Sequence, residues 1–287
     1  MFRQNRLAVA RGLGLAVALC AWSVSALAED SPQLPWQAGG STYAIGSVSE
    51  IDLPEDYIFL DQPGTMRLME LTQNPVSGTE LATVAPTSEG ESWFLVFEFE
   101  DTGYVKDDEA EDLDPDAILS SIREGTKAGN EERRKRGWPT VEIQGWQEPP
   151  RYDSFTNHLS WAISARSEGH EIVNRNVRLL GRGGVMSATL VSDPMALASA
   201  SRRADQLLTH FRYTEGNTYA EFNARTDKIA EYGLGALIVG GGAAALVKSG
   251  LLARFWKVIV AGAVGVAAVV RRFFRGRSAT EEPITRV

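Results

Sequence analysis

The sequence predicts an α+β domain with a mainly antiparallel sheet and helices packed on one face. Two observations favour this class. Short stretches with apolar residues at alternate positions occur in groups joined by turns, as in antiparallel strands. Longer stretches with helical spacing stand between these groups, which is typical of helices inserted between blocks of strands. The expected order is strand, helix, paired strands, helix, strand meander, helix.

The expected strands are apolar or alternating stretches that end at glycine, proline or polar residues. They cover residues 43–53, 81–85, 93–100, 141–146, 159–165, 172–180 and 185–191. In the third of these, one face carries apolar residues at period two, the pattern of a strand lying on a core: Trp93, Leu95, Phe97 and Phe99. The Gly-Arg-Gly-Gly sequence at 181–184 predicts a tight hairpin between the last two strands.

Three helices are expected, over residues 61–71, 114–136 and 194–210. The second has the clearest boundaries. Asp114 is suited to cap its start, and Pro115 occupies the first position, where its missing N–H costs nothing. Gly137 and Pro139 end it.

The first 28 residues have the pattern of a cleavable export signal. An apolar core over residues 12–21 follows three basic residues: Arg3, Arg6 and Arg11. A small-x-small triplet ends at Ala28, so we expect cleavage after Ala28. An uncleaved anchor would need about 20 apolar residues, roughly twice the length of this core.

Cys20 is the only cysteine, and it lies within this signal. The mature protein is therefore expected to lack thiols, which excludes disulfides, thiolate nucleophiles and cysteine metal sites. Use of Cys20 as a lipid acceptor is disfavoured because Leu19 stands where lipoprotein signals carry a small residue.

The C-terminal end predicts a glycine- and alanine-rich membrane anchor over residues 229–270 and a basic tail over 271–287. Its two apolar runs, 232–247 and 258–270, are each shorter than the about 20 residues of a standard span. A single span would place the basic tail in the cytoplasm, whereas a helical hairpin would place there the basic residues between the runs. The two alternatives are nearly balanced, with a slight preference for the hairpin.

The charge is distributed unevenly along the chain. Residues 29–228 carry 34 acids and 18 bases, net −16, whereas residues 229–287 carry 3 acids and 8 bases, net +5. An acidic domain repels nucleic acid, so we expect no nucleic-acid partner. With the two ends of the chain, this predicts a bacterial inner-membrane protein with a linker at 29–40 and its main domain, 41–228, in the periplasm.

The sequence offers no recognisable catalytic, cofactor or metal motif, so we expect none of these sites. Asp112, Asp114 and Asp116 resemble the start of a calcium loop. The resemblance ends there, because Ala117 stands at the glycine position and Arg123 at the position of the terminal glutamate. These residues are interpreted as an acidic loop and a helix cap.

Aromatic and acidic side chains provide a candidate partner-binding site. Its residues are Trp138, Trp146, Tyr152, Asp107 and Asp108. The functional interpretation is an exposed aromatic groove that receives a peptide or a glycan. The structural interpretation is that the aromatic residues cover the end of the sheet.

Four separate segments carry a resemblance to a known family: FEFEDTGYVKDD at 97–108, IREGT at 122–126, RGWP at 136–139 and RLLGRGGVM at 178–186. They resemble the DUF2167 family of membrane-anchored bacterial proteins, and the likeness runs from about residue 38 into the anchor. The resemblance implies location and topology but no catalytic residue. The element order is also loosely similar to the PsbP/Mog1-type sandwich, a fold used mostly for binding.

The function expected from these features is that of a non-enzymatic binding or scaffold protein whose partner is another envelope protein. One alternative is a hydrolase that uses the carboxylates of Glu98, Glu100 and Asp101. Another is a subunit of an inner-membrane complex, in which small residues at every fourth position pack against another helix. These residues, which also suggest oligomerisation, are Ala236, Gly240 and Ala244.

Overall fold

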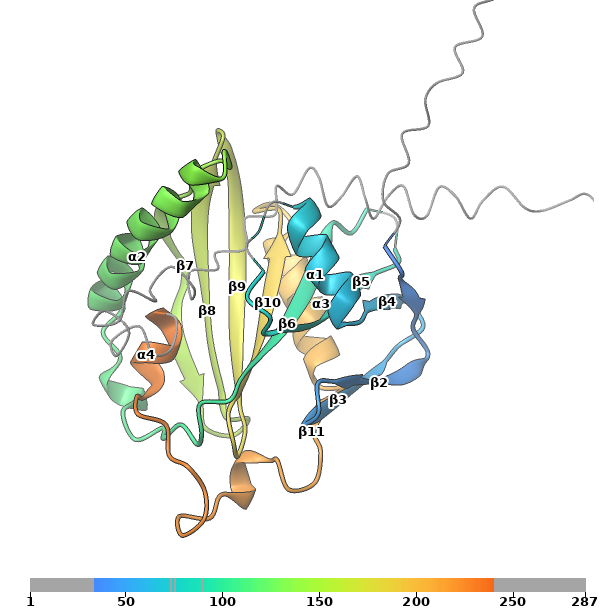
Figure 1. Cartoon of the computed structure of the whole chain (residues 1–287), viewed down its shortest axis with the longest axis vertical. Helices are drawn as coiled ribbons and strands as arrows, with labels where there is room; N and C mark the ends of the chain where they lie inside the picture. The colour runs from blue at the N-terminus through green and yellow to red at the C-terminus, as the bar shows by residue number, and fades with distance from the viewer. Residues whose placement is uncertain (1–33, 73, 75, 89, 240–287) are drawn as a thin grey trace, which may run out of the picture. The chain divides into compact units, whose positions relative to one another are not determined.

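The computed structural model describes residues 34–72, 74, 76–88 and 90–239. These residues form an α+β fold with two antiparallel sheets (Figure 1). The strands are β1 (Gln37–Ala38), β2 (Ser41–Ile45), β3 (Ser49–Leu53), β4 (Tyr57–Leu60), β5 (Glu80–Pro86), β6 (Trp93–Glu100), β7 (Glu142–Asp153), β8 (His158–Ser167), β9 (His170–Leu180), β10 (Val185–Ser192) and β11 (Phe211–Tyr213). The helices are α1 (Gln62–Leu71), α2 (Pro115–Lys135), α3 (Leu197–Leu208) and α4 (Leu234–Val239), with short 3-10 turns at Ala110–Asp112 and Tyr219–Glu221.

The large sheet has the strand order β1-β4-β5-β6-β10-β9-β8-β7, and the small sheet has the order β11-β3-β2. All of the strand pairings in both sheets are antiparallel. The predicted fold class, an α+β domain with a large antiparallel sheet, is therefore confirmed.

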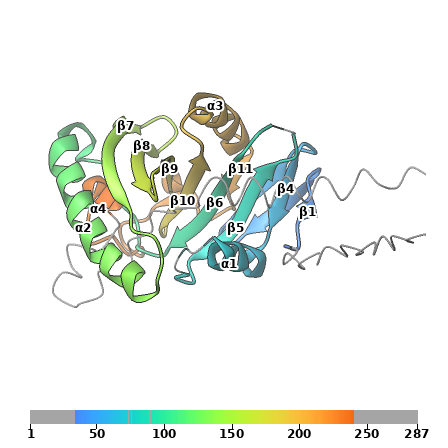
Figure 2. The same cartoon turned by 90° about the horizontal axis from the view of Figure 1, so that it is seen from above.

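Helices cover both faces of the large sheet, so the prediction that they lie on one face is wrong. Alternate side chains of β6 point to opposite faces. Leu95 and Phe97 pack into a core with α3 and the small sheet, whereas Phe94 and Val96 pack into a core with α1. Figure 2 shows α1 and α3 on opposite sides of the sheet. The continuous apolar run of β6 is thus the pattern of a strand that is buried on both faces.

A third core lies under α2 and α4 at the β7 end of the sheet. Ile118 and Ile122 of α2 pack there with Leu159 of β8 and with Leu237 of α4. α4 lies within the segment predicted to be the membrane anchor, but Leu234 and Leu237 are almost completely buried in this core. The folded domain therefore extends to Val239 rather than ending near residue 228.

None of the helices within residues 34–239 is long and apolar enough to cross a membrane. The predicted signal (1–28), the rest of the anchor (240–270) and the basic tail (271–287) lie outside the described residues.

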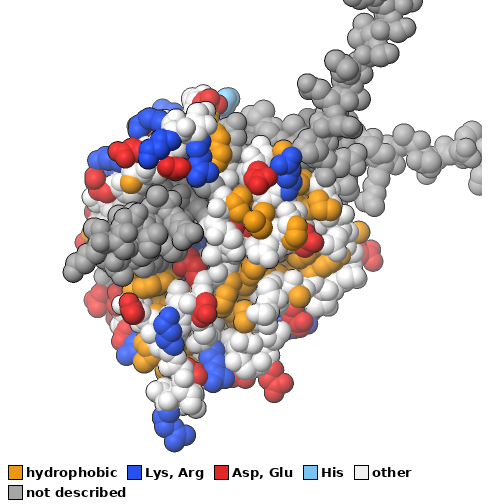
Figure 3. Space-filling model, viewed as in Figure 1, with side chains coloured by type: hydrophobic (Ala, Val, Ile, Leu, Met, Phe, Trp, Pro, Cys, Tyr) orange, Lys and Arg blue, Asp and Glu red, His pale blue; other side chains and the backbone are white. Residues whose placement is uncertain are grey.

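The predicted helix cap at Asp114 is confirmed, and Asp61 caps the start of α1. The carboxylate of Asp114 accepts hydrogen bonds from the backbone N–H groups of Asp116 and Ala117, at 3.0 and 3.1 Å. Asp61 accepts one from Gly64 N–H at 3.0 Å. At the other end of α2, basic side chains complement the negative end of the helix dipole, and Figure 3 shows them gathered over its upper part.

Other boundaries differ from the prediction. The stretch 43–53, predicted to be one strand, forms β2 and β3, because Gly46 adopts a φ of 66° at the turn between them. Residues 57–60, predicted as no element, form β4. Part of the predicted linker forms β1, which pairs with β4. β7 continues through Pro149 and Pro150, which it tolerates because it lies at the edge of the sheet.

Candidate functional site

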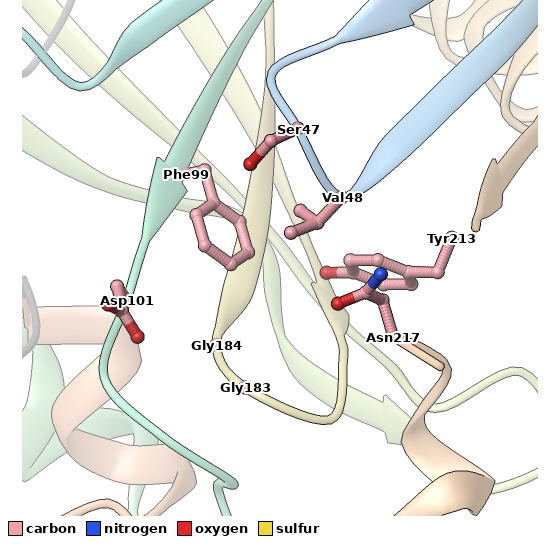
Figure 4. Close-up of a pocket in the computed structure, with 8 residues that line it drawn as sticks. All are labelled: Ser47, Val48, Phe99, Asp101, Gly183, Gly184, Tyr213 and Asn217. Atoms are coloured by element: carbon pink, nitrogen blue, oxygen red, sulfur yellow. The ribbon is translucent and has the colours of Figure 1, made fainter. Parts of the chain in front are cut away.

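A pocket of about 430 Å³ lies where the ends of β6, β10 and β11 meet the turn between β2 and β3. Its lining residues are Ser47, Val48, Phe99, Asp101, Gly183, Gly184, Tyr213 and Asn217. Figure 4 shows Phe99 on one side of the pocket, Tyr213 and Asn217 on the other, and the turn with Gly183 and Gly184 below them. The pocket thus combines residues from four separate parts of the chain.

Two glycines of the β9–β10 turn allow the side chains that line this pocket to pack directly against the turn. A Cβ atom on Gly184 would lie 2.2 Å from the carbonyl oxygen of Glu100 and 2.7 Å from the ring of Phe99. A Cβ atom on Gly181 would lie 2.6 Å from the ring of Tyr213. Only glycine permits these approaches, so these two residues place the aromatic walls against the turn.

Tyr213 is fixed by its hydroxyl group. It donates a hydrogen bond to Leu179 C=O at 2.7 Å and accepts one from Met186 N–H at 2.9 Å. Leu179 and Met186 are direct partners across β9 and β10, so the small sheet is joined here to the large sheet. Burial raises the pKa of Tyr213, which keeps the hydroxyl protonated at neutral pH.

The polar groups of the pocket come from Ser47, Asn217 and Asp101. Asn217 is oriented by a hydrogen bond from its amide nitrogen to Thr214 Oγ1 at 3.0 Å, and its backbone carbonyl accepts one from Arg182 N–H at 2.9 Å. The side chains of Ser47 and Asp101 are exposed. Aromatic walls with one carboxylate and several hydrogen-bonding groups suit an extended peptide or a cationic group.

An ion pair holds the chain that follows β11 against the β9–β10 turn. Arg182 Nε lies 2.7 Å from Asp227 Oδ2, and Arg182 Nη2 lies 2.9 Å from Asp227 Oδ1, a bidentate arrangement. Arg182 Nη1 also donates to Gly216 C=O at 3.2 Å. The hydrogen bonds from Arg182 and from Asn223 N–H hold the pKa of Asp227 well below its usual range.

We expect this ion pair to contribute to the stability of the fold at neutral pH, and we expect that contribution to be lost at acidic pH. The pKa of Asp227 is lower in the folded state than in the unfolded state, so its stabilising contribution is present above the ordinary carboxyl pKa of about 4 and is lost as pH falls below it. Thermal midpoints measured from pH 7 to pH 3 should therefore fall less steeply for Asp227→Asn than for the wild type. Glu215→Gln, which changes an exposed carboxylate in the same segment, should keep the wild-type slope. Parallel curves for Asp227→Asn and the wild type would contradict this role.

A stack of aromatic rings beside the pocket joins the segment after β6 to the segment after β11. Tyr104 stacks on Tyr219 and on Phe222, with ring centroids 4.4 and 3.8 Å apart. Gly103 N–H donates to Gly183 C=O at 3.0 Å, so the segment after β6 is joined directly to the β9–β10 turn. The sequence segments 97–108 and 178–186 therefore meet at the pocket end of the sheet.

The structure brings together only some of the predicted partner-binding residues. Tyr152 donates a hydrogen bond to Asp107 at 2.9 Å, with exposed Asp108 next in the chain. Trp146 donates to Pro115 C=O at 3.1 Å, at the start of α2. Trp138 lies beyond the other end of α2, about 30 Å away along the helix, where Arg136 stands 5.0 Å from its ring. The structure does not bring Trp138 together with the others.

The three carboxylates considered for hydrolysis do not converge. Glu98 and Glu100 alternate with Phe99 along β6, so they point to the opposite face of the sheet from the ring that lines the pocket. Asp101 is the member of this set that lines the pocket.

The sequence interpretation missed most of the pocket. The sequence predicts a strand over 43–53 that includes Ser47, and Tyr213 and Asn217 lie beyond the last predicted helix. Two features of the sequence point to the pocket: Asp101, a candidate carboxylate, and the turn at 181–184, where three glycines in four residues indicate a close approach of other groups. The glycines do not indicate which residues of the chain approach the turn.

The fold and the pocket define an α+β protein with a large antiparallel sheet and a pocket at one end of that sheet. The chain belongs to the family described as protein of unknown function, DUF2167, whose model matches residues 37–271. No curated protein matches the chain. Among solved structures, the chain is similar to the solution structure of cyanobacterial PsbP (CyanoP) from Synechocystis sp. PCC 6803, with 11% identity and a TM-score of 0.36, over 64% of this chain and 95% of that one.

Proposed function

We propose that this protein is a non-enzymatic binding protein of the bacterial envelope, whose pocket holds a segment of another envelope protein. The export pattern before residue 29 and the apolar runs after residue 239 support a periplasmic domain tethered to the inner membrane. The net charge of −16 over residues 29–228 favours a partner segment that carries basic side chains.

The pocket is the observation that carries this proposal. Tyr213 and Phe99 provide aromatic surfaces for a side chain, and Asp101 provides a carboxylate for a basic group. Ser47 and Asn217 provide hydrogen-bonding groups for the backbone of an extended segment. The pocket is open to a polypeptide because Ser47 and Asp101 lie at the exposed surface.

The alternatives considered from the sequence receive less support. A carboxylate-based hydrolase would use paired acids, but Asp101 lines the pocket without Glu98 or Glu100. A membrane-complex subunit that packs through Ala236 would need that residue at a helix interface. Ala236 lies on α4, a helix that packs into the core of the same chain through Leu234, Leu237 and Ile238.

Filling the pocket should abolish partner capture. We expect Ser47→Trp to remove the proteins that co-purify with the affinity-tagged full chain after chemical crosslinking of intact cells, because the indole would occupy the space between Val48 and Phe99. Ser199→Trp is the matched control and should capture the same proteins as the wild type, because Ser199 is exposed at the start of α3, which follows the end of β10 opposite to Gly184. Equal capture by Ser47→Trp and the control, at equal thermal midpoints, would show that the pocket is not the binding site.

A further inference from the structure

A second polar cluster lies in the middle of the large sheet, on the face that carries α1 and α2. Ser187 of β10 is the direct partner of Arg178 on β9 and of Glu98 on β6, so the three side chains form one row across the sheet. In Figure 1 these three strands lie between α2 and α4 on one side and α1 on the other. The ring of Trp161 on β8 lies beside the row, 5.0 Å from the guanidinium carbon of Arg178.

Arg178 and Ser187 hold buried hydrogen-bonding groups that have no partner among the described residues. Ser187 is 1% exposed, and its hydroxyl has no hydrogen-bond partner among the residues that the structure describes. Within the same part of the chain, Nε and Nη1 of Arg178 are inaccessible to solvent and equally unpartnered. Burial lowers the pKa of Arg178, although the nearby carboxylates of Glu100 and Glu98 oppose this shift.

Such an arrangement is costly unless another group accepts these hydrogen bonds. Leaving one buried donor unsatisfied costs about 1–3 kcal/mol, and more for a charged group. The great majority of buried polar groups in folded proteins have a partner. The three donors are Nε and Nη1 of Arg178 and the hydroxyl of Ser187. They lie close together because the two residues are direct partners on β9 and β10, where opposed Cβ atoms are about 5 Å apart.

We propose that Arg178 and Ser187 bind a carboxylate group of a ligand on this face of the sheet. A carboxylate matches the planar donors of a guanidinium and can also accept from a hydroxyl. The ring of Trp161 lies 5.0 Å from the guanidinium carbon, so it occupies one side of this group. The negative potential of Glu98 and Glu100 favours a singly charged carboxylate over a doubly charged phosphate.

The proposal predicts a carboxylate-dependent stabilisation of the full chain, purified in detergent. Sodium acetate is the probe, with sodium chloride and sodium phosphate at equal ionic strength as comparisons. A ligand that binds the folded state should raise the thermal midpoint of the wild type by roughly 3–5 °C for each tenfold rise in acetate above the dissociation constant. Arg178→Gln should remove this response, and the wild type should respond less to phosphate than to acetate.

Ser187→Ala tests the site in a variant that we expect to fold. Without acetate its midpoint should equal or exceed that of the wild type, because the buried hydroxyl has no partner among the described residues. Its apparent acetate affinity should be roughly tenfold weaker, because one hydrogen bond to the carboxylate is lost. A wild-type midpoint that does not distinguish acetate from chloride would overturn the proposal, as would an equal acetate response of Arg178→Gln. A stronger response to phosphate would overturn the assignment of a carboxylate.

Discussion

Replacement of Gly184 by alanine is expected to destabilise the protein by about 3 kcal/mol or more, at the upper end of the cost of overpacking. The new Cβ atom would lie 2.2 Å from Glu100 C=O and 2.7 Å from the ring of Phe99. The first of these atoms belongs to the backbone of β6, a central strand, so it cannot move away as a flexible side chain could. The β9–β10 turn would have to separate from the end of β6, which also opens the pocket.

The neighbouring glycine provides the control for this substitution. A Cβ atom on Gly183 would meet no other atom within 4 Å, so Gly183→Ala should leave stability unchanged or raise it by up to about 1 kcal/mol through the unfolded state. Guanidinium unfolding followed by tryptophan fluorescence gives both values. A free energy of unfolding for Gly184→Ala within about 0.5 kcal/mol of the wild type would contradict the close contact between turn and strand.

Truncation of Leu237 to alanine should cost about 2–5 kcal/mol, the range for a large apolar side chain removed from a packed core. Leu237 is 1% exposed and packs with Ile118 and Ile122 of α2. The expected loss is large because α4 forms part of the domain core, whereas a helix that belonged only to a membrane anchor would contribute nothing to the stability of the domain.

The matched control is Ile229→Ala, a truncation in the same segment at a side chain that is 41% exposed. It should change stability by less than about 1 kcal/mol. Both variants can be measured on the full chain in detergent by guanidinium unfolding. An equal, small effect of the two substitutions would place α4 outside the cooperative unit of the domain.

Local chemistry explains which parts of the fold could be predicted. The start of α2 followed from Asp114 and Pro115, because capping and proline geometry act within a few residues. The bounds of β6 followed from its apolar run between polar residues. The same run also carries Phe94 and Val96 on the opposite face, so its continuous apolar character is the signal that both faces are covered.

The pocket could not be predicted because its residues are far apart in the sequence. Ser47, Asp101, Gly183 and Tyr213 come from four different turns or strand ends, and only the pairing of β2 with β3, of β3 with β11 and of β6 with β10 brings them together. The buried row at Arg178 has the same origin. The sequence of β9 alone gives no sign that the guanidinium of Arg178 is buried. Its burial depends on Trp161 and Ser187, which lie on the neighbouring strands β8 and β10.

Site-specific photocrosslinking in intact cells tests most directly whether the pocket binds a partner. A photoreactive amino acid is placed at Ser47 in the pocket, at Asp108 in the acidic loop or at Glu168, an exposed residue of the β8–β9 turn. The account predicts a discrete adduct from Ser47, identifiable by mass spectrometry of the membrane fraction, and none from Glu168. An adduct from Asp108 together with none from Ser47 would contradict it, because the partner would then bind the acidic loop and not the pocket.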